Sequence, residues 1–121
     1  NMSTVIIWGD ITGIGQNAFK NCSSLDDISI PSSCEVIDES AFQGCTDLDT
    51  VILWGDTNIG NSAFRGCTSL EEISISRGTE YIGDYAFEGC SSLEDVIMWG
   101  RSTRIGLDAF ANCPKLNNAP K

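Results

Sequence analysis

Hydrophobic residues recur along this chain with a period of 22 or 23 residues. Each unit contains Ala-Phe, then a Cys three residues after the Phe and a Leu three residues after the Cys. Self-similarity at a fixed period in the twenties is typical of a solenoid in which each unit supplies one strand and one turn or short helix. The sequence therefore predicts a stack of coils. The phenylalanines of the five units are Phe19, Phe42, Phe64, Phe87 and Phe110.

Recurrence also identifies the positions that face the core. Val51 and Leu53 alternate with other residues at the end of the second unit, which is the period expected of a strand with one buried face. The spacing of Ala, Phe, Cys and Leu fits a helical turn on the opposite side of the coil. Each coil is therefore predicted to contain a strand, a turn, a short helix and a second turn. The inward residues of the second unit are Ile37, Ala41, Phe42, Cys45, Leu48, Val51 and Leu53.

The length of 121 residues and a hydrophobic content of 41% suit one ordinary folded unit. We therefore expect residues 1–121 to form a single solenoid of five coils. The repeat begins and ends partway through a coil, and no polar cap covers either end, so we expect a segment of a longer repeat protein. No apolar run approaches the roughly 20 residues that cross a bilayer, so this segment is not expected to insert into a membrane.

The formal net charge of −10 comes from 7 basic and 17 acidic residues. Such a surface repels phosphate backbones and anionic lipid headgroups. Nucleic acid is therefore not an expected partner.

Five of the six cysteines occupy the same place in every unit, as buried core thiols would, and Cys34 alone lies outside the repeat. The chain has no His and no Cys-x-x-Cys, so a zinc site is not expected. Neither a metal nor a cofactor is predicted.

The repeat Ile-Gly-x-x-Ala-Phe-x-x-Cys-x-x-Leu-x-x-Ile-x-Ile, followed in one unit by Pro31, resembles the BspA-like class of leucine-rich repeats. This resemblance covers essentially the whole chain. It implies an α/β leucine-rich-repeat solenoid with a parallel β-sheet on one face and short helical turns on the other. It also implies a cell-surface or secreted protein of the kind used in adhesion to host matrix proteins and to other cells.

Three of the five strands depart from the family pattern because they end in Trp-Gly instead of Ile-Pro. Since Val51 and Leu53 point inward, Ile52 and Trp54 must point outward. Smaller Ser or Pro residues occupy the same outward places in the intervening strands. So large an exposed apolar patch marks a contact surface. The predicted outward apolar residues are Ile6, Ile52, Ile97, Trp8, Trp54 and Trp99.

Several readings of this face remain open. We expect a protein-binding surface, because Trp is enriched at interface hot spots. A second reading is packing of the solenoid on copies of itself, which with the open ends would build filaments or layers. A third is an extended polysaccharide that stacks its sugar rings on the aromatic planes. Alternatively, each Trp folds back over the neighbouring Ser or Pro and its own loop and covers the sheet edge.

Carboxylates form a second ladder just before the strands. Calcium would relieve the repulsion between such stacked charges, but no loop has the alternating Asp/Asn spacing of a dedicated calcium site. We therefore interpret the ladder as a solvated acidic rim. Its residues are Asp26, Asp27, Asp49, Glu71, Glu72, Glu94 and Asp95.

Catalysis has little support in the sequence. Without His there is no imidazole base to activate Ser or Cys, and no glycine-rich phosphate loop is present. Cys34, between Ser33 and Glu35, is the one reactive candidate that breaks the repeat, and it fits a partly covered loop residue or a tether better than a nucleophile. The chain is therefore not expected to be an enzyme.

Overall fold

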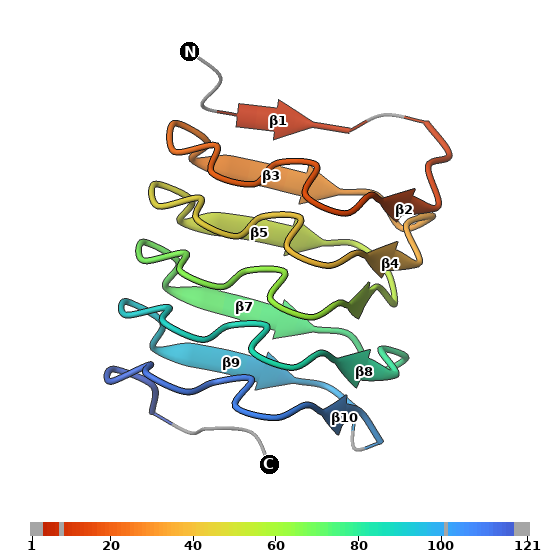
Figure 1. Ribbon diagram of the computed structural model, residues 1–121. Coiled ribbons are helices and arrows are strands. Elements are labelled where there is room, and N and C mark those ends of the chain that lie inside the picture. Colours follow the sequence, from red (N-terminus) through yellow and green to blue (C-terminus); the bar gives the residue numbers. More distant parts are fainter. Residues whose placement is uncertain (1–3, 8, 101, 118–121) are drawn as a thin grey trace.

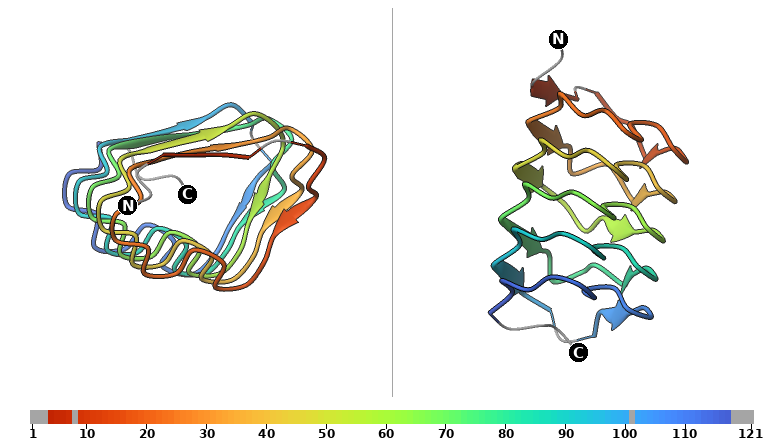
Figure 2. Two further views of the ribbon diagram at one scale, coloured as in Figure 1. Left: turned by 90° about the horizontal axis from the view of Figure 1, so that it is seen from above. Right: turned by 60° about the vertical axis from the view of Figure 1, so that its left-hand side comes forward.

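The protein is a solenoid of stacked coils, as seen in a computed structural model that describes residues 4–7, 9–100 and 102–117 (Figure 1). Each coil contributes one longer strand to a front face, which we call the long-strand face. Viewed along the stack, the coils superpose and enclose one core (Figure 2). The longer strands are β1 (Thr4–Ile6), β3 (Asp27–Ile30), β5 (Thr50–Leu53), β7 (Glu72–Ile75) and β9 (Asp95–Met98).

A second parallel sheet lies after the loop that follows each longer strand. Its strands pair in the order β10-β8-β6-β4-β2, so this sheet runs through the stack without interruption. Wherever strands of successive coils pair, equivalent residues lie side by side, for example Ile28 beside Val51 and Ile82 beside Ile105. The short strands are β2 (Gly13–Ile14), β4 (Val36–Ile37), β6 (Asn58–Ile59), β8 (Tyr81–Ile82) and β10 (Arg104–Ile105).

A column of phenylalanines fills the centre of the core. Neighbouring rings from Phe19 to Phe110 are stacked with centroids 5.1 to 5.2 Å apart and planes within 4° of parallel. Phe42, Phe64 and Phe87 are fully buried. Each such aromatic pair contributes about 0.5 to 1.5 kcal/mol beyond the area that it buries. The predicted stack of coils and its phenylalanine column are therefore present in the fold.

The prediction of a short helix in each coil is wrong, because the described residues contain no helix. The segment around Phe42 is a run of β-turns with left-handed residues at Ser40 (φ 58°) and Gly44 (φ 78°). The Gln43 amide donates to Ser40 within the coil at 3.2 Å, whereas the Phe42 amide donates to Ala63 in the next coil at 2.7 Å. A helix would direct both amides along its own axis and leave the next coil without a partner. We call this side of the solenoid the turn face.

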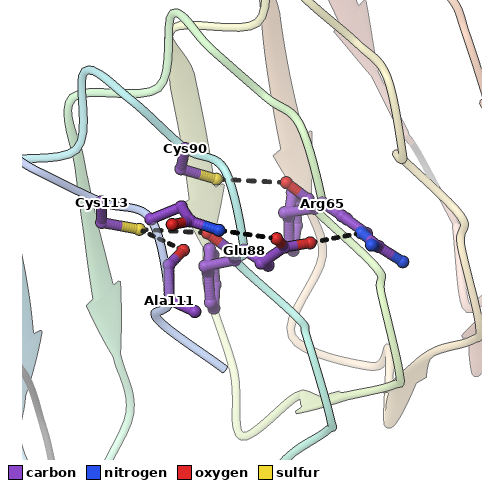
Figure 3. Close-up of polar contacts among 8 residues, drawn as sticks. Arg65, Glu88, Cys90, Ala111 and Cys113 are labelled. Atoms are coloured by element: carbon purple, nitrogen blue, oxygen red, sulfur yellow. Dashed lines mark hydrogen bonds and ion pairs between the residues drawn. The ribbon is translucent and has the colours of Figure 1, made fainter. Parts of the chain in front are cut away.

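Thiols form a second column beside the phenylalanines. The Cys67 Sγ donates to the carbonyl oxygen of Phe42 at 3.2 Å, and that of Cys90 donates to Phe64 at 3.2 Å. Cys113 repeats the contact with the carbonyl oxygen of Phe87 (Figure 3). Burial raises the pKa of Cys45 to about 11 and raises those of Cys67 and Cys90 as well. Cys45, Cys67 and Cys90 are buried and Cys113 is half-buried, and the thiol of each bonds to a carbonyl oxygen of the preceding coil.

The long-strand face is interrupted between β5 and β7. These neighbours are not paired, so the longer strands form one sheet of β1, β3 and β5 and another of β7 and β9. Figure 1 shows a wider step between β5 and β7 than between the other longer strands. The loop between β5 and β6 has four residues, whereas those after β3, β7 and β9 have five. We call this interruption the seam. It lies beside β5, the strand that is followed by the shortened loop.

We expect Phe64→Ala to lower the free energy of unfolding by about 3 to 5 kcal/mol, because it removes the middle ring of the column and leaves a cavity. Chemical denaturation followed by circular dichroism measures the change. Leu107→Ala, at a side chain that is 62% exposed, is the control and should unfold almost like the parent. A Phe64→Ala variant as stable as the parent would contradict the proposed column.

Cys67 and Cys90 should resist alkylation in the folded protein, because burial raises their pKa and the thiolate is the nucleophile. At pH 8 we expect iodoacetamide to label half-buried Cys22 at least about tenfold faster than either. Mass spectrometry of tryptic peptides gives the rate for each cysteine. In guanidinium chloride all of these rates should converge, and equal rates in the native protein would count against the thiol column.

Candidate binding face

At the centre of the longer strands, the side chain that points outward is Ile in β1, β5 and β9 and Ser in β3 and β7. Ile6, Ile52 and Ile97 are all exposed, whereas the inward neighbours Ile28 and Ile73 are buried. This alternation follows from the strand period of two. The three isoleucines therefore lie where the sequence predicts them, separated by the smaller serines.

Two tryptophans extend this apolar set at the ends of their strands. Trp54 and Trp99 are 67% and 63% exposed, although each indole is held by a hydrogen bond. Trp54 Nε1 donates to the Ser29 hydroxyl at 2.8 Å, and Trp99 Nε1 donates to the Ser74 hydroxyl at 2.9 Å. Each indole thus leans back over the serine of the preceding coil and remains largely open to solvent. Trp8, predicted to belong to the same set, lies outside the described residues.

The serine partners explain why the outward pattern repeats every two coils. A coil ending in Trp follows a coil with Ser at the strand centre, and the small Ser leaves room for the indole. The sequence showed both residue types in alternation, but the hydrogen bond between them was not predicted. The bond orients the indole, which would otherwise turn freely at an exposed position.

A groove runs along the seam between β5 and β7. It has a volume of about 500 Å³ and lies between residues 49–54 and 71–74. Val51 and Ile73 line it from the core side, while Ile52 and Trp54 of the outward apolar set also line it. The groove was not predicted from the sequence. The interval of 22 residues between Phe42 and Phe64 shows that one residue is missing, but such a deletion does not reveal that two strands are unpaired.

The acidic rim lies along the starts of the longer strands. Asp26 and Asp27 are half-buried, and the other five carboxylates of the rim are exposed. Asp27 accepts a hydrogen bond from Thr4, and Asp95 accepts one from Asn117. Among residues 4–7, 9–100 and 102–117, no group of three or more His, Cys, Asp or Glu side chains is placed to hold a metal ion.

Cys34 is more deeply buried than the sequence suggested. Its thiol is 1% exposed and donates to the Val36 carbonyl oxygen at 3.4 Å. Burial is the main cause that raises the pKa of this thiol. The expected partly covered loop residue is therefore a core residue, and its thiol is shielded from reagents.

The turn face carries a different, charged set of contacts. Arg65 Nε lies 2.5 Å from Glu88 Oε1, and its guanidinium lies 5.3 Å from the centre of the Tyr85 ring. Asn112 Nδ2 donates to the other oxygen of Glu88 at 2.9 Å (Figure 3). These contacts link three successive coils. The charges of Arg65 and Glu88 are therefore paired within the solenoid, whereas the long-strand face leaves apolar side chains exposed to solvent.

Comparison with known proteins identifies the repeat. The sequence model of the BspA type leucine rich repeat region matches residues 1–117 in six copies. A leucine-rich repeat protein from Bacteroides ovatus has a similar solved structure, with a TM-score of 0.72 and 31% identity over 93% of this chain and 35% of that one. No curated protein matches the chain.

Two further solved structures are similar. A leucine rich cell surface protein from Faecalibacterium prausnitzii gives a TM-score of 0.77 and 28% identity over 96% of this chain and 38% of that one. The leucine rich repeat protein of T. pallidum gives 0.56 and 22% identity over 97% of this chain and 79% of that one, a likeness of fold. The chain thus spans little more than a third of the first two proteins. In the described residues, no helix is long and apolar enough to cross a membrane.

Proposed function

Since the chain belongs to the BspA-type leucine-rich-repeat family, we propose that it is a protein-binding module of a cell-surface or secreted protein. The long-strand face makes the contact, through Ile52, Ile97, Trp54 and Trp99. Ile6 and Trp8 occupy the equivalent places in the first coil and belong to the same proposed surface. The expected partners are host matrix or cell-surface proteins.

The observation that supports this proposal most directly is the pair of oriented, exposed indoles. Trp is enriched at interface hot spots because it buries a large area at little cost in conformational entropy. Here Ser29 and Ser74 already hold the indole nitrogens of Trp54 and Trp99, so binding would cost still less ordering. Exposed side chains that are oriented in advance suit recognition of a partner.

The proposed location is supported by the relatives and not by the chain alone. The similar protein from Faecalibacterium prausnitzii is a cell surface protein, and the net charge of −10 supports a protein partner over nucleic acid. The prediction that the chain is not an enzyme stays a prediction.

Self-association is the second candidate function. The exposed isoleucines of β5 and β9 form an apolar surface that a copy of the chain could cover. A structural role in filaments or layers would then replace recognition of a foreign partner.

Changing Trp54 and Trp99 to Ser together should weaken binding to a protein partner at least about tenfold, because hot-spot aromatics dominate interfaces. The intact chain is first screened on an array of purified extracellular-matrix and cell-surface proteins beside a glycan array, and binding to the hits is then titrated. Leu107→Ser is the matched control, since it removes an equally exposed apolar side chain from the turn face. Equal loss in both variants, or hits on glycans alone, would overturn the protein-binding proposal.

Analytical ultracentrifugation separates recognition from self-association. We expect the parent to sediment as a monomer up to about 100 µM. Any self-association would then have a dissociation constant in the millimolar range. If the parent forms oligomers that the Trp54→Ser/Trp99→Ser variant loses, the long-strand face serves self-assembly.

A further inference from the structure

The centre of the long-strand face carries one apolar group per coil. In β1, β5 and β9 this group is an isoleucine. In β3 and β7 the central residue is Ser29 or Ser74, and the indole of the following longer strand bonds to its hydroxyl and lies over it. These groups form a line across the strands, which we call the apolar strip. Its members, all at least 40% exposed, are Ile6, Ile52, Ile97, Trp54 and Trp99.

A column of carboxylates runs beside the apolar strip on the same outward side. Side chains two residues apart on a strand share a face, so Glu72 lies on the same side as Ser74, about 6.7 Å away along the strand. Asp27 and Asp95 hold the same place in β3 and β9. The five longer strands contain no Lys or Arg. The strip is therefore bordered by negative charge without a cation from its own strands.

Two of these carboxylates are oriented by hydrogen bonds but keep their charge. Asp27 accepts a bond from the Thr4 hydroxyl at 3.4 Å, and Asp95 accepts one from Asn117 Nδ2 at 3.0 Å. Both donors are neutral, so these bonds do not neutralise the carboxylates. Glu72 and Asp95 are also exposed. A cationic group of a partner on the strip would therefore make charge-assisted hydrogen bonds with this column.

The spacing of the strip selects the shape of the partner. Paired strands lie about 4.8 Å apart, and the phenyl rings of the same coils repeat at 5.1 to 5.2 Å. An α-helix returns to the same face once per turn, about every 5.4 Å, whereas an extended strand does so about every 6.7 Å. Over the four steps from β1 to β9 a helix drifts from the strip by about 1 to 2.5 Å, but a strand drifts by about 6 to 8 Å, more than one coil.

The seam brings the strip still closer to the repeat of a helix. Two turns of a helix cover about 10.5 Å, whereas two steps between paired strands cover about 9.6 Å. The step from β5 to β7 is wider than the others (Figure 1). That step lies between Ile52 and Ile97, and also between Trp54 and Trp99. The wider step therefore moves both of these two-coil spans towards two helical turns.

We propose that the apolar strip binds an amphipathic helix of the partner protein. The helix lies along the solenoid axis across β1 to β9, where about 13 residues span the strip, and its Lys or Arg side chains face Glu72 and Asp95. Apolar anchors at i, i+3, i+4 and i+7 supply one contact per coil. The inference rests on the proposed function, because it names the kind of protein segment that the long-strand face takes.

This helix belongs to a different protein and not to a second copy of the chain. Residues 4–7, 9–100 and 102–117 contain no helix that a copy could place on the strip. Each copy also carries the same net charge of −10, so the acidic columns of two copies would repel each other. A basic amphipathic helix complements both the apolar strip and the carboxylates beside it.

Two fluorescent peptides of identical Leu, Lys, Gln and Ala content test the shape of the partner. Each is about 18 residues long, or five helical turns. The first places Leu at steps of three and four residues with Lys along one flank, and the second alternates Leu with polar residues. We expect anisotropy titration to give at least about tenfold tighter binding of the first peptide, and circular dichroism to show that it gains helix on binding. Equal affinities, or no binding of either, would overturn the proposal.

A pair of strip variants locates the contact. Ile52→Ser/Ile97→Ser gives β5 and β9 the central serine that β3 and β7 already have, so the fold should tolerate it. We expect this double variant to weaken the first peptide at least about tenfold. Leu107→Ser, on the turn face, should change its binding less than about twofold. Equal effects would overturn a site on the strip.

A pair of charge variants tests the flank of the helix. Glu72→Lys/Asp95→Lys reverses two charges beside the strip, whereas Glu35→Lys/Glu39→Lys reverses two exposed charges on either side of β4. Both variants change the net charge equally. We expect the first to weaken the helical peptide about tenfold and the second to change its binding less than about twofold. Equal effects would show general attraction to an acidic protein and would overturn the flank contact.

The proposed helix and the proposed protein binding can fail separately. If proteins from the array lose binding in Trp54→Ser/Trp99→Ser but neither peptide binds the parent chain, the partner has another shape. The helix is then overturned and the protein-binding proposal stands. If neither the array proteins nor the peptides bind, both proposals are overturned.

Discussion

The fold depends on the hydrogen bonds that pass from one coil to the next along the turn face. The amides of Phe19, Phe42, Phe64 and Phe87 each donate to the alanine carbonyl of the following coil, at 2.7 to 2.8 Å. These bonds fix the rise between coils at a value that also stacks the phenyl rings 5.1 to 5.2 Å apart. Because ring stacking and backbone bonding require the same spacing, they reinforce each other through the whole solenoid. The long-strand face can then lose one ladder of hydrogen bonds without separating the coils.

The sequence predicted the inward residues well, because the same positions are buried in every coil and five copies of the repeat show which positions stay hydrophobic. Val51 and Phe42 are buried where the period of two and the Phe interval place them. The helix was wrongly predicted because consecutive turns and a helix share a spacing of three residues. The residues before each Ala, which include Asn17, Ser40 and Ser62, adopt positive φ and force the turns. Asn and Gly adopt positive φ readily, whereas Ser does so less often. The residue types at these positions therefore did not clearly favour turns over a helix.

The contacts of the outward residues were harder to predict, because the sequence period does not show which side chains of neighbouring coils touch. Alternation of Trp and Ser marked a two-coil period, and the structure gives it a cause in the bonds from Trp54 to Ser29 and from Trp99 to Ser74. From the sequence, an indole that covers the sheet edge and an indole exposed to a partner were two alternatives. In the structure each indole covers a serine and still exposes about two thirds of its surface. A residue can therefore be held by its own fold and remain available to a partner.

A solenoid of equivalent coils has no unique site unless something breaks the repeat. Here the repeat is broken because the loop after β5 is one residue shorter than the equivalent loops. The side chains of Asp56 and Asn58 accept hydrogen bonds from backbone amides of the next coil. The backbone bonds that a sheet would have placed between β5 and β7 are absent, and the open edges lie beside apolar and acidic side chains that every coil shares. The ladders alone would offer a partner many equal positions. The seam makes one of these positions distinct, because among the described neighbouring longer strands only β5 and β7 lack the backbone ladder.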